Sequence, residues 1–224
     1  GFLLDKPVRM LAGKSLGEIW RERVADPLDL DLWIGLPESE HHRVATLYPG
    51  KADKAELESG FYKEFNQLGS LVKRAFGSPK GLHGVHEMNT AKAWQAALPA
   101  MGGVSTADAL AKFYQACIGN IECFSDDVRG WMQESQIMGE DLILCTPTHF
   151  SCGFQKDPLH ADGRKMRRHY GPCENAFGHP GAGGSHAFGD PQNGISFAYT
   201  MNQMDLAVLP GAKSLNLIDA LYSL

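Results

Sequence analysis

The stretch FGHPGAGGSHAFGDPQNGISFAYTMNQM, residues 177–204, decides the fold. Asn193-Gly194, after Asp190-Pro191, predicts a hairpin turn, because Asn and Gly both tolerate a positive φ. The strand after the turn alternates strictly, which is typical of a half-buried β-strand. Its large side chains are Ile195, Phe197, Tyr199 and Met201, and its small or polar ones are Ser196, Ala198, Thr200 and Asn202. The small face would let a helix approach the strand closely.

Working outward, the rest of the chain predicts an α+β fold. We expect a mainly helical part of the domain over residues 1–140, and antiparallel strands with a C-terminal helix over residues 141–224. The expected helices cover 3–11 (broken or kinked at Pro7), 16–25, 51–67, 70–76, a short piece before Pro99, 106–118, 126–136 and 214–224. The second begins with a capping box, Ser15-x-x-Glu18. The helix over 106–118 has an apolar stripe at helical spacing: Leu110, Phe113, Tyr114, Cys117 and Ile118. The last helix is expected to bury one side, which carries Leu217, Ile218, Leu221 and Tyr222. Residues 29–50 and 157–173 read as loops.

Composition excludes several classes of protein. The 224 residues carry a net charge of −5, which argues against a nucleic acid or an anionic membrane as partner. No apolar run approaches the roughly 18 residues that would span a bilayer. The five cysteines form no CxxC pair and their number is odd, which indicates reduced thiols. With no signal peptide at GFLLDKPVRML, this favours the cytoplasm, although the chain begins mid-pattern.

The glycine-rich segment suggests a binding site. Gly181, Gly183 and Gly184 would leave backbone amides uncovered, and such N–H groups can stabilise an oxyanion. His179 would stand beside them and donate a hydrogen bond or move a proton. The alternative is that the glycines mark a bulge or tight packing and that His179 is an ordinary surface residue.

The same segment resembles the C-terminal part of the serine β-lactamase-like family, which includes class C β-lactamases, D-alanyl-D-alanine carboxypeptidases and family VIII carboxylesterases. The third motif of that family, Lys-Thr-Gly, is often His-x-Gly in esterase-like members, and here His179-Pro180-Gly181 matches it. AGKSLGEIWRERVADPLDLD, WIGLPESEHHRVA and GGVSTADALAKFYQA are also similar to family segments. The resemblance therefore covers nearly the whole chain.

The resemblance implies a serine hydrolase that forms an acyl-enzyme with an ester or amide and needs no metal or other cofactor. His179 and Ala182 would be its catalytic residues, with the backbone N–H of Ala182 in the oxyanion hole. Gly178, Pro180, Gly181 and Gly183 would bind the substrate. Histidine in place of lysine favours an esterase-like member, because a neutral imidazole anchors a carboxylate less well than an ammonium does.

The family's Ser-x-x-Lys and Tyr motifs are expected before residue 1, on an N-terminal half that would be the natural partner of this chain. Pro7 also departs from the family helix. The alternative is a non-catalytic pseudo-enzyme or binding module with the same fold.

Three further patterns are weaker candidates. Ser70-Leu-Val-Lys73 matches Ser-x-x-Lys, but its neighbours resemble a peripheral helix, so we expect a solvated helix face. His83-x-x-His86-Glu87 lacks the spacing of a zinc helix. The basic run Arg164, Lys165, Arg167 and Arg168, flanked by His160 and His169, reads as a solvated loop that could attract an anionic substrate.

Overall fold

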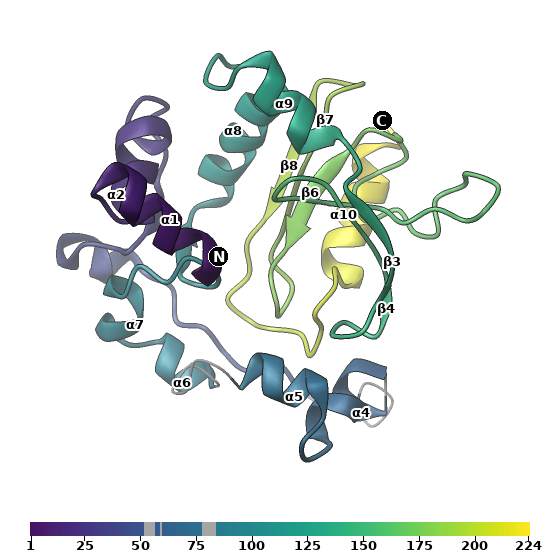
Figure 1. Cartoon of the computed structure of the whole chain (residues 1–224), viewed down its shortest axis with the longest axis horizontal. Coiled ribbons are helices and arrows are strands. Elements are labelled where there is room, and N and C mark those ends of the chain that lie inside the picture. Colours follow the sequence, from purple (N-terminus) through teal and green to yellow (C-terminus); the bar gives the residue numbers. More distant parts are fainter. Residues whose placement is uncertain (52–56, 59, 78–83) are drawn as a thin grey trace.

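A computed structural model describes residues 1–51, 57–58, 60–77 and 84–224. Its centre is a six-stranded antiparallel sheet in the order β3-β4-β5-β6-β7-β8 (Figure 1). The strands are β3 (Ile137–Asp141), β4 (Thr146–Phe150), β5 (Gln155–Lys156), β6 (Phe177–Pro180), β7 (His186–Asp190) and β8 (Ile195–Tyr199). The α+β prediction is confirmed, and the sheet begins slightly before residue 141.

The predicted hairpin is present. β7 pairs with β8 from His186↔Tyr199 to Asp190↔Ile195, and Gly194 has a φ of 66°. The Asp190 carboxylate closes the turn by accepting hydrogen bonds from the backbone N–H groups of Gln192 (3.0 Å) and Asn193 (3.2 Å). β8 ends at Tyr199, so the alternation predicted for residues 200–202 lies outside the strand.

Helix α8 (Ala107–Cys117) packs on the small-residue face of this hairpin. Ala187 and Ala198 join the buried cluster of Tyr114 and Cys117, which lie on the helix. The Gln115 amide donates to Ser196 Oγ at 2.9 Å, which joins the helix to β8 directly. The side chains of the predicted apolar stripe of this helix therefore face the sheet and the neighbouring core, as expected.

Helix α10 (Ala212–Leu221) covers the opposite face, as Figure 1 shows. Ile218 packs with Phe188 and Tyr170, and Phe197 borders this cluster. Leu217, which we expected on the buried side of the helix, is 49% exposed, so that assignment is wrong. The buried stripe instead combines Ile218 with Leu215 and Tyr222.

The helical part departs from expectation at several places. Helix α1 (Phe2–Ala12) runs through Pro7 without a break and ends at Gly13, whose φ is 67°. Residues 29–50 are not all loop, because β1 (Leu32–Ile34) pairs with β2 (Gly103–Ser105) in a two-stranded sheet. A three-residue strand is too short to show alternation, and its partner is distant in sequence.

Several other helices match the predictions with shifted ends. The capping box at Ser15 opens α2 (Leu16–Trp20), which continues as a π-helical turn, η1 (Arg21–Ala25). The others that match are α4 (Gly60–Asn66), α5 (Leu71–Phe76), α7 (Ala91–Gln95) and α9 (Asp126–Gln133), whereas η2 (Glu38–Arg43) and α6 (Val85–Met88) lie where we expected loops. Residues 52–56 and 59, part of the helix expected over 51–67, lie outside the described residues. Within the described ranges, no helix combines the length and the apolar character that a membrane crossing requires.

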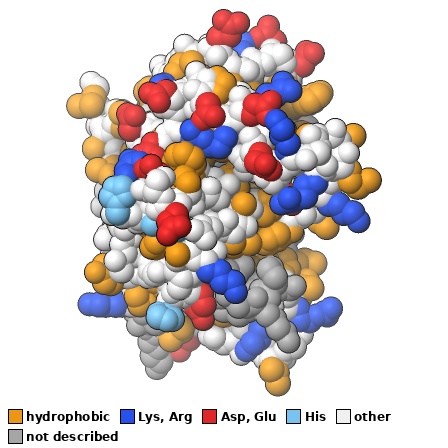
Figure 2. All heavy atoms as spheres, turned by 90° about the vertical axis from the view of Figure 1, so that its left-hand side faces the viewer, with side chains coloured by type: hydrophobic (Ala, Val, Ile, Leu, Met, Phe, Trp, Pro, Cys, Tyr) orange, Lys and Arg blue, Asp and Glu red, His pale blue; other side chains and the backbone are white. Residues whose placement is uncertain are grey.

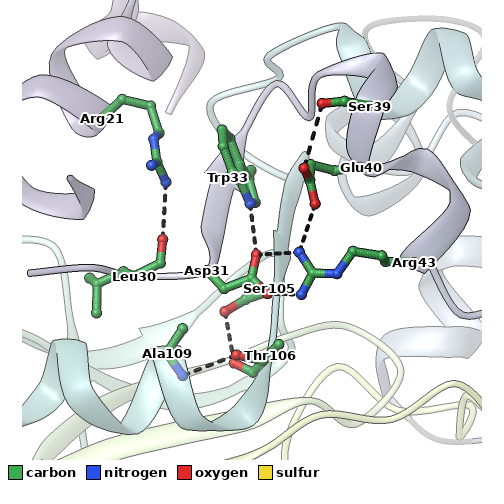
Figure 3. A network of polar contacts seen from close by, with 10 residues as sticks. All are labelled: Arg21, Leu30, Asp31, Trp33, Ser39, Glu40, Arg43, Ser105, Thr106 and Ala109. Carbon is green, nitrogen blue, oxygen red and sulfur yellow. Dashed lines mark hydrogen bonds and ion pairs between the residues drawn. The ribbon is translucent and has the colours of Figure 1, made fainter.

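A polar network joins these small elements to one another (Figure 3). The Asp31 carboxylate accepts from Trp33 Nε1 at 2.9 Å and from the Arg43 guanidinium, which also binds Glu40 at 2.8 Å. The Arg21 guanidinium lies 3.9 Å from the Trp33 ring centre and donates to the Leu30 carbonyl. The network therefore holds β1 between η1 and η2.

The contact between α8 and β7 leaves no room for a side chain at Gly189. A Cβ there would lie 2.5 Å from Ile118 Cγ2. Gly189→Ala is expected to lower the free energy of unfolding by about 1–3 kcal/mol, because the added methyl group would force α8 and β7 apart or Ile118 out of its place. Urea denaturation measures this. Gly139→Ala in β3 is the control, since its Cβ meets nothing within 4 Å, and equal stabilities of the two variants would contradict the prediction.

His186 makes the fold sensitive to acid. It is 1% exposed, its Nδ1 lies 3.3 Å from Ser214 Oγ, and burial lowers its pKa to about 3. When the pKa of a histidine is lower in the folded protein than in the unfolded chain, the unfolded chain takes up the proton first as the pH falls. The free energy of unfolding is therefore highest above the pKa of the unfolded chain and decreases below it. We expect stability to decline from about pH 6.5 towards pH 3, by up to about 1.4 kcal/mol per pH unit for this residue.

His186→Phe should flatten that decline, because phenylalanine cannot take up a proton. Urea denaturation at a series of pH values tests this, with His42→Gln at an exposed position as the control. An unchanged pH dependence in His186→Phe would contradict the assignment.

Candidate functional site

The turn between β6 and β7 carries the predicted site. His179 pairs with Ala187 and Pro180 with His186, so the two strands enter the turn in fixed register. Gly183 and Gly184 have φ values of 93° and 117°, which glycine adopts readily and other residues rarely do. A Cβ on Gly183 would lie 2.3 Å from Met204 Cε. The glycines are thus required by the turn and by the segment packed on it.

Most amides of this turn are already occupied. The N–H of Gly181 donates to Ser185 O (2.6 Å), that of Gly183 to Ala207 O (2.8 Å), and that of Gly184 to Gly181 O (3.0 Å). The expectation that these three amides are free is therefore wrong. Ala182 is exposed, and its N–H has no acceptor within the residues that the structure describes. This amide alone among the four can bind an oxyanion directly.

The predicted substrate-binding residues differ in their access to solvent. Gly178, Pro180 and Gly183 are buried, whereas Gly181 is half-buried. Gly178 also sits against β7, since a Cβ there would lie 2.3 Å from Ala187 O. These residues shape the strand and turn, and the exposed groups are the His179 side chain and Ala182.

His179 lies at the exposed end of β6. Strand alternation places its side chain on the same face as Phe177, the face that α8 covers further along the sheet. Its Nδ1 lies 2.8 Å from Pro180 O. The surrounding chain desolvates the ring and lowers the pKa of His179, while the Pro180 carbonyl raises it by a smaller amount. The ring is consequently neutral near pH 7.

The side chain of Tyr114 contacts the backbone of His179. This residue of α8 is 4% exposed, and the backbone N–H of His179 faces its hydroxyl oxygen. Burial raises the pKa of Tyr114 well above its usual value, so the hydroxyl stays protonated. The sequence placed Tyr114 only in an apolar stripe, because no local pattern shows which backbone group a buried hydroxyl reaches.

Two clefts lie elsewhere on the molecule. One, of about 270 Å³, adjoins the turn and is lined by Lys51, Gln203, Met204, Asp205, Leu206 and Lys213. The larger, of about 690 Å³, lies between α2, β1 and α7. Figure 2 shows acidic and basic side chains interspersed over the face with these helices, so no single charge dominates it. Neither cleft is lined by residues 178–183.

The basic loop is not simply solvated. The Lys165 ammonium lies 3.0 Å from Asp157 Oδ2, and these side chains are 10% and 0% exposed. Arg167 donates to Pro147 O at 2.7 Å. Burial raises the pKa of Asp157, and the ammonium opposes this effect. Only Arg164 and Arg168 are exposed, so the expectation of a fully solvated basic run is wrong.

Ser70 is a helix cap. Its hydroxyl donates to Glu64 O and accepts from the backbone N–H of Lys73 at 3.0 Å, while Lys73 is exposed. Ser70 and Lys73 therefore hold the N-terminus of α5 rather than forming a nucleophile pair. His83 lies outside the described residues, and in the described part no three His, Cys, Asp or Glu side chains gather as metal ligands.

Removing the ammonium from the buried pair should destabilise the loop that leads into β6. Lys165→Met leaves Asp157 buried without its cation, and we expect a loss of about 3–5 kcal/mol in the free energy of unfolding. Arg164→Met, which removes the ion pair of an 81% exposed arginine, should cost far less, because solvent screens an exposed pair. Urea denaturation compares the two, and similar losses would contradict the buried-pair assignment.

Comparisons with known proteins complement this geometry. A family model described as Beta-lactamase matches residues 1–221. The esterase/beta-lactamase LipL of Mycobacterium tuberculosis is 28% identical over 214 residues, covering 91% of this chain and 47% of that protein. A penicillin-binding protein homologue from Caulobacter crescentus has a TM-score of 0.74 and 32% identity over 100% of this chain and 56% of that one.

A family VIII carboxylesterase has a similar likeness, with a TM-score of 0.75 and 28% identity over 98% of this chain and 55% of its own. The chain therefore spans about half the length of the relatives it matches.

Proposed function

Because the chain belongs to the β-lactamase family, we propose that it supplies the oxyanion side of the acyl-transfer site of a serine hydrolase. The substrate is an ester or amide, and the reaction passes through an acyl-enzyme. An esterase-like activity is proposed in preference to that of a true β-lactamase.

One observation carries the proposal: the amide of Ala182, which has no acceptor within the described residues, is exposed on the turn that follows the strand bearing the neutral imidazole of His179. An N–H held by a rigid turn can stabilise developing negative charge without reorganising. Ala182 N–H therefore receives the substrate's carbonyl oxygen as the carbonyl carbon becomes tetrahedral.

The nucleophile is proposed to lie on polypeptide outside these 224 residues. The chain has a single Ser-x-x-Lys, and its serine is a helix cap. In the proposed reaction a serine hydroxyl from an N-terminal half attacks the carbonyl carbon and gives its proton to a neighbouring base. Collapse of the oxyanion breaks the bond to the alcohol or amine, which leaves with a proton, and water then hydrolyses the acyl-enzyme.

The esterase-like preference rests on the residue at position 179. A lysine there would offer an ammonium to a substrate carboxylate, whereas a neutral imidazole offers no net charge. The relative from Mycobacterium tuberculosis carries both names, esterase and beta-lactamase, and one of the similar structures is a carboxylesterase. Both agree with an ester substrate.

The alternative is a non-catalytic protein with the same fold. The capping role of Ser70 favours it, since this removes the one nucleophile pair that the sequence contains. A serine-reactive phosphonate separates the two. It should label the chain expressed with the polypeptide encoded upstream of Gly1, and absence of labelling there would favour the non-catalytic alternative.

Removing the Ala182 N–H tests the oxyanion role. In the chain expressed with the polypeptide encoded upstream of Gly1, Ala182→Pro should lower kcat for a chromogenic short-chain ester by about 10²–10³-fold, because proline has no N–H to donate. Ala182→Gly keeps the donor and is the matched control, and a denaturation curve checks that both variants fold. Equal kcat in the two variants would refute the role. Ser70→Ala should leave kcat unchanged.

A further inference from the structure

The hydrogen bond of His179 determines which ring nitrogen carries the proton. Nδ1 lies 2.8 Å from the carbonyl oxygen of Pro180, and a carbonyl oxygen can only accept. Nδ1 must therefore be the donor. In a neutral ring the other nitrogen, Nε2, then carries a lone pair. Within the described residues Nε2 has no hydrogen-bond partner.

This tautomer is held by backbone that cannot easily move. Pro180 pairs with His186, and its ring restricts φ to about −65°, which limits the direction of its carbonyl. The N–H of His179 faces the buried Tyr114 hydroxyl. Desolvation and the Pro180 carbonyl are the influences on the pKa of His179, and neither is a carboxylate that would keep the ring charged.

We propose that His179 acts on the substrate as a hydrogen-bond acceptor through Nε2, so that the site prefers esters or amides with a hydroxyl or N–H near the scissile bond and disfavours carboxylates. This inference rests on the proposed function, since it names the substrate class of the same site. It differs from the two roles expected from the sequence, in which His179 donates a hydrogen bond or moves a proton.

The preference follows from the chemistry of the lone pair. A substrate hydroxyl can donate to Nε2, whereas an ether oxygen in its place cannot. A carboxylate brings its lone pairs against the lone pair of Nε2, and no cation of the described residues acts on His179. Because His179 is exposed, we expect about tenfold selectivity for the hydroxyl rather than the 10⁴–10⁵ of a fully buried polar pocket.

The tautomer can be measured on the 224-residue chain itself. Long-range ¹H–¹⁵N NMR of ¹⁵N-histidine-labelled protein at neutral pH distinguishes a proton-bearing ring nitrogen from a bare one, and His179→Gln assigns the signal. We expect the proton on Nδ1. A proton on Nε2 would overturn the inference, whatever the catalytic activity turns out to be.

The substrate preference is measured on the chain expressed with the polypeptide encoded upstream of Gly1. Three butyrate esters serve as probes: 2-hydroxyethyl, 2-methoxyethyl, which lacks the donor, and carboxymethyl, which carries the anion. We expect kcat/KM for the hydroxyethyl ester to exceed each of the others by about tenfold, because only its hydroxyl can donate to Nε2.

Two variants show whether His179 causes the preference. His179→Phe should remove the advantage of the hydroxyethyl over the methoxyethyl ester, and His179→Lys should favour the carboxymethyl ester. Equal turnover of the three esters by the unaltered protein, or an unchanged ranking in both variants, would overturn the substrate preference. Inactivity towards all three would instead overturn the proposed function, while the NMR result on the tautomer would stand separately.

Discussion

The close packing of α8 against the small side chains of β7 and β8 is the contact on which the site depends. Gly189, Ala187 and Ala198 let the helix backbone approach the sheet, since a Cβ at Gly189 would already collide with Ile118. That approach brings the Tyr114 hydroxyl to the backbone N–H of His179. A larger residue on this face would move the helix away, and the strand that bears the imidazole would lose its support.

The turn after this strand holds the backbone N–H groups of its three glycines in hydrogen bonds and leaves the N–H of Ala182 without an acceptor among the described residues. Of the amides of residues 181–184, three are bonded to carbonyl oxygens of the turn or of residues 185–207, and the exception is Ala182. In the proposed reaction, a donor left free in a rigid turn would already be oriented when the substrate binds, so little free energy would be lost in ordering it. The glycines serve this rigidity through their φ values and their close contact with Met204, rather than by exposing a row of amides.

Beyond the turn, several charged residues that the sequence predicts to be solvated have structural roles. Lys165 and Asp157 form a buried pair that holds the loop before β6, and Arg167 binds a carbonyl of β4. In the helical part, Arg43 and Asp31 join β1 to η2. Polar contacts thus hold the loops around the apolar sheet.

Local physics made much of the fold predictable from the sequence by itself: the hairpin at Asn193-Gly194, the two-faced strand β8, the capping box at Ser15 and the apolar stripe of α8 each depend on residues a few positions apart. His179 and Ala182 were chosen as candidates through the resemblance of their segment to a family motif, and their roles stay predictions. Only the tertiary structure decided which amide of the turn is free, that Ser70 is a cap, that Lys165 is buried, and that β1 pairs with β2. Each of these depends on a partner that is distant in sequence or on a choice among equivalent donors and acceptors, and no local pattern encodes that choice.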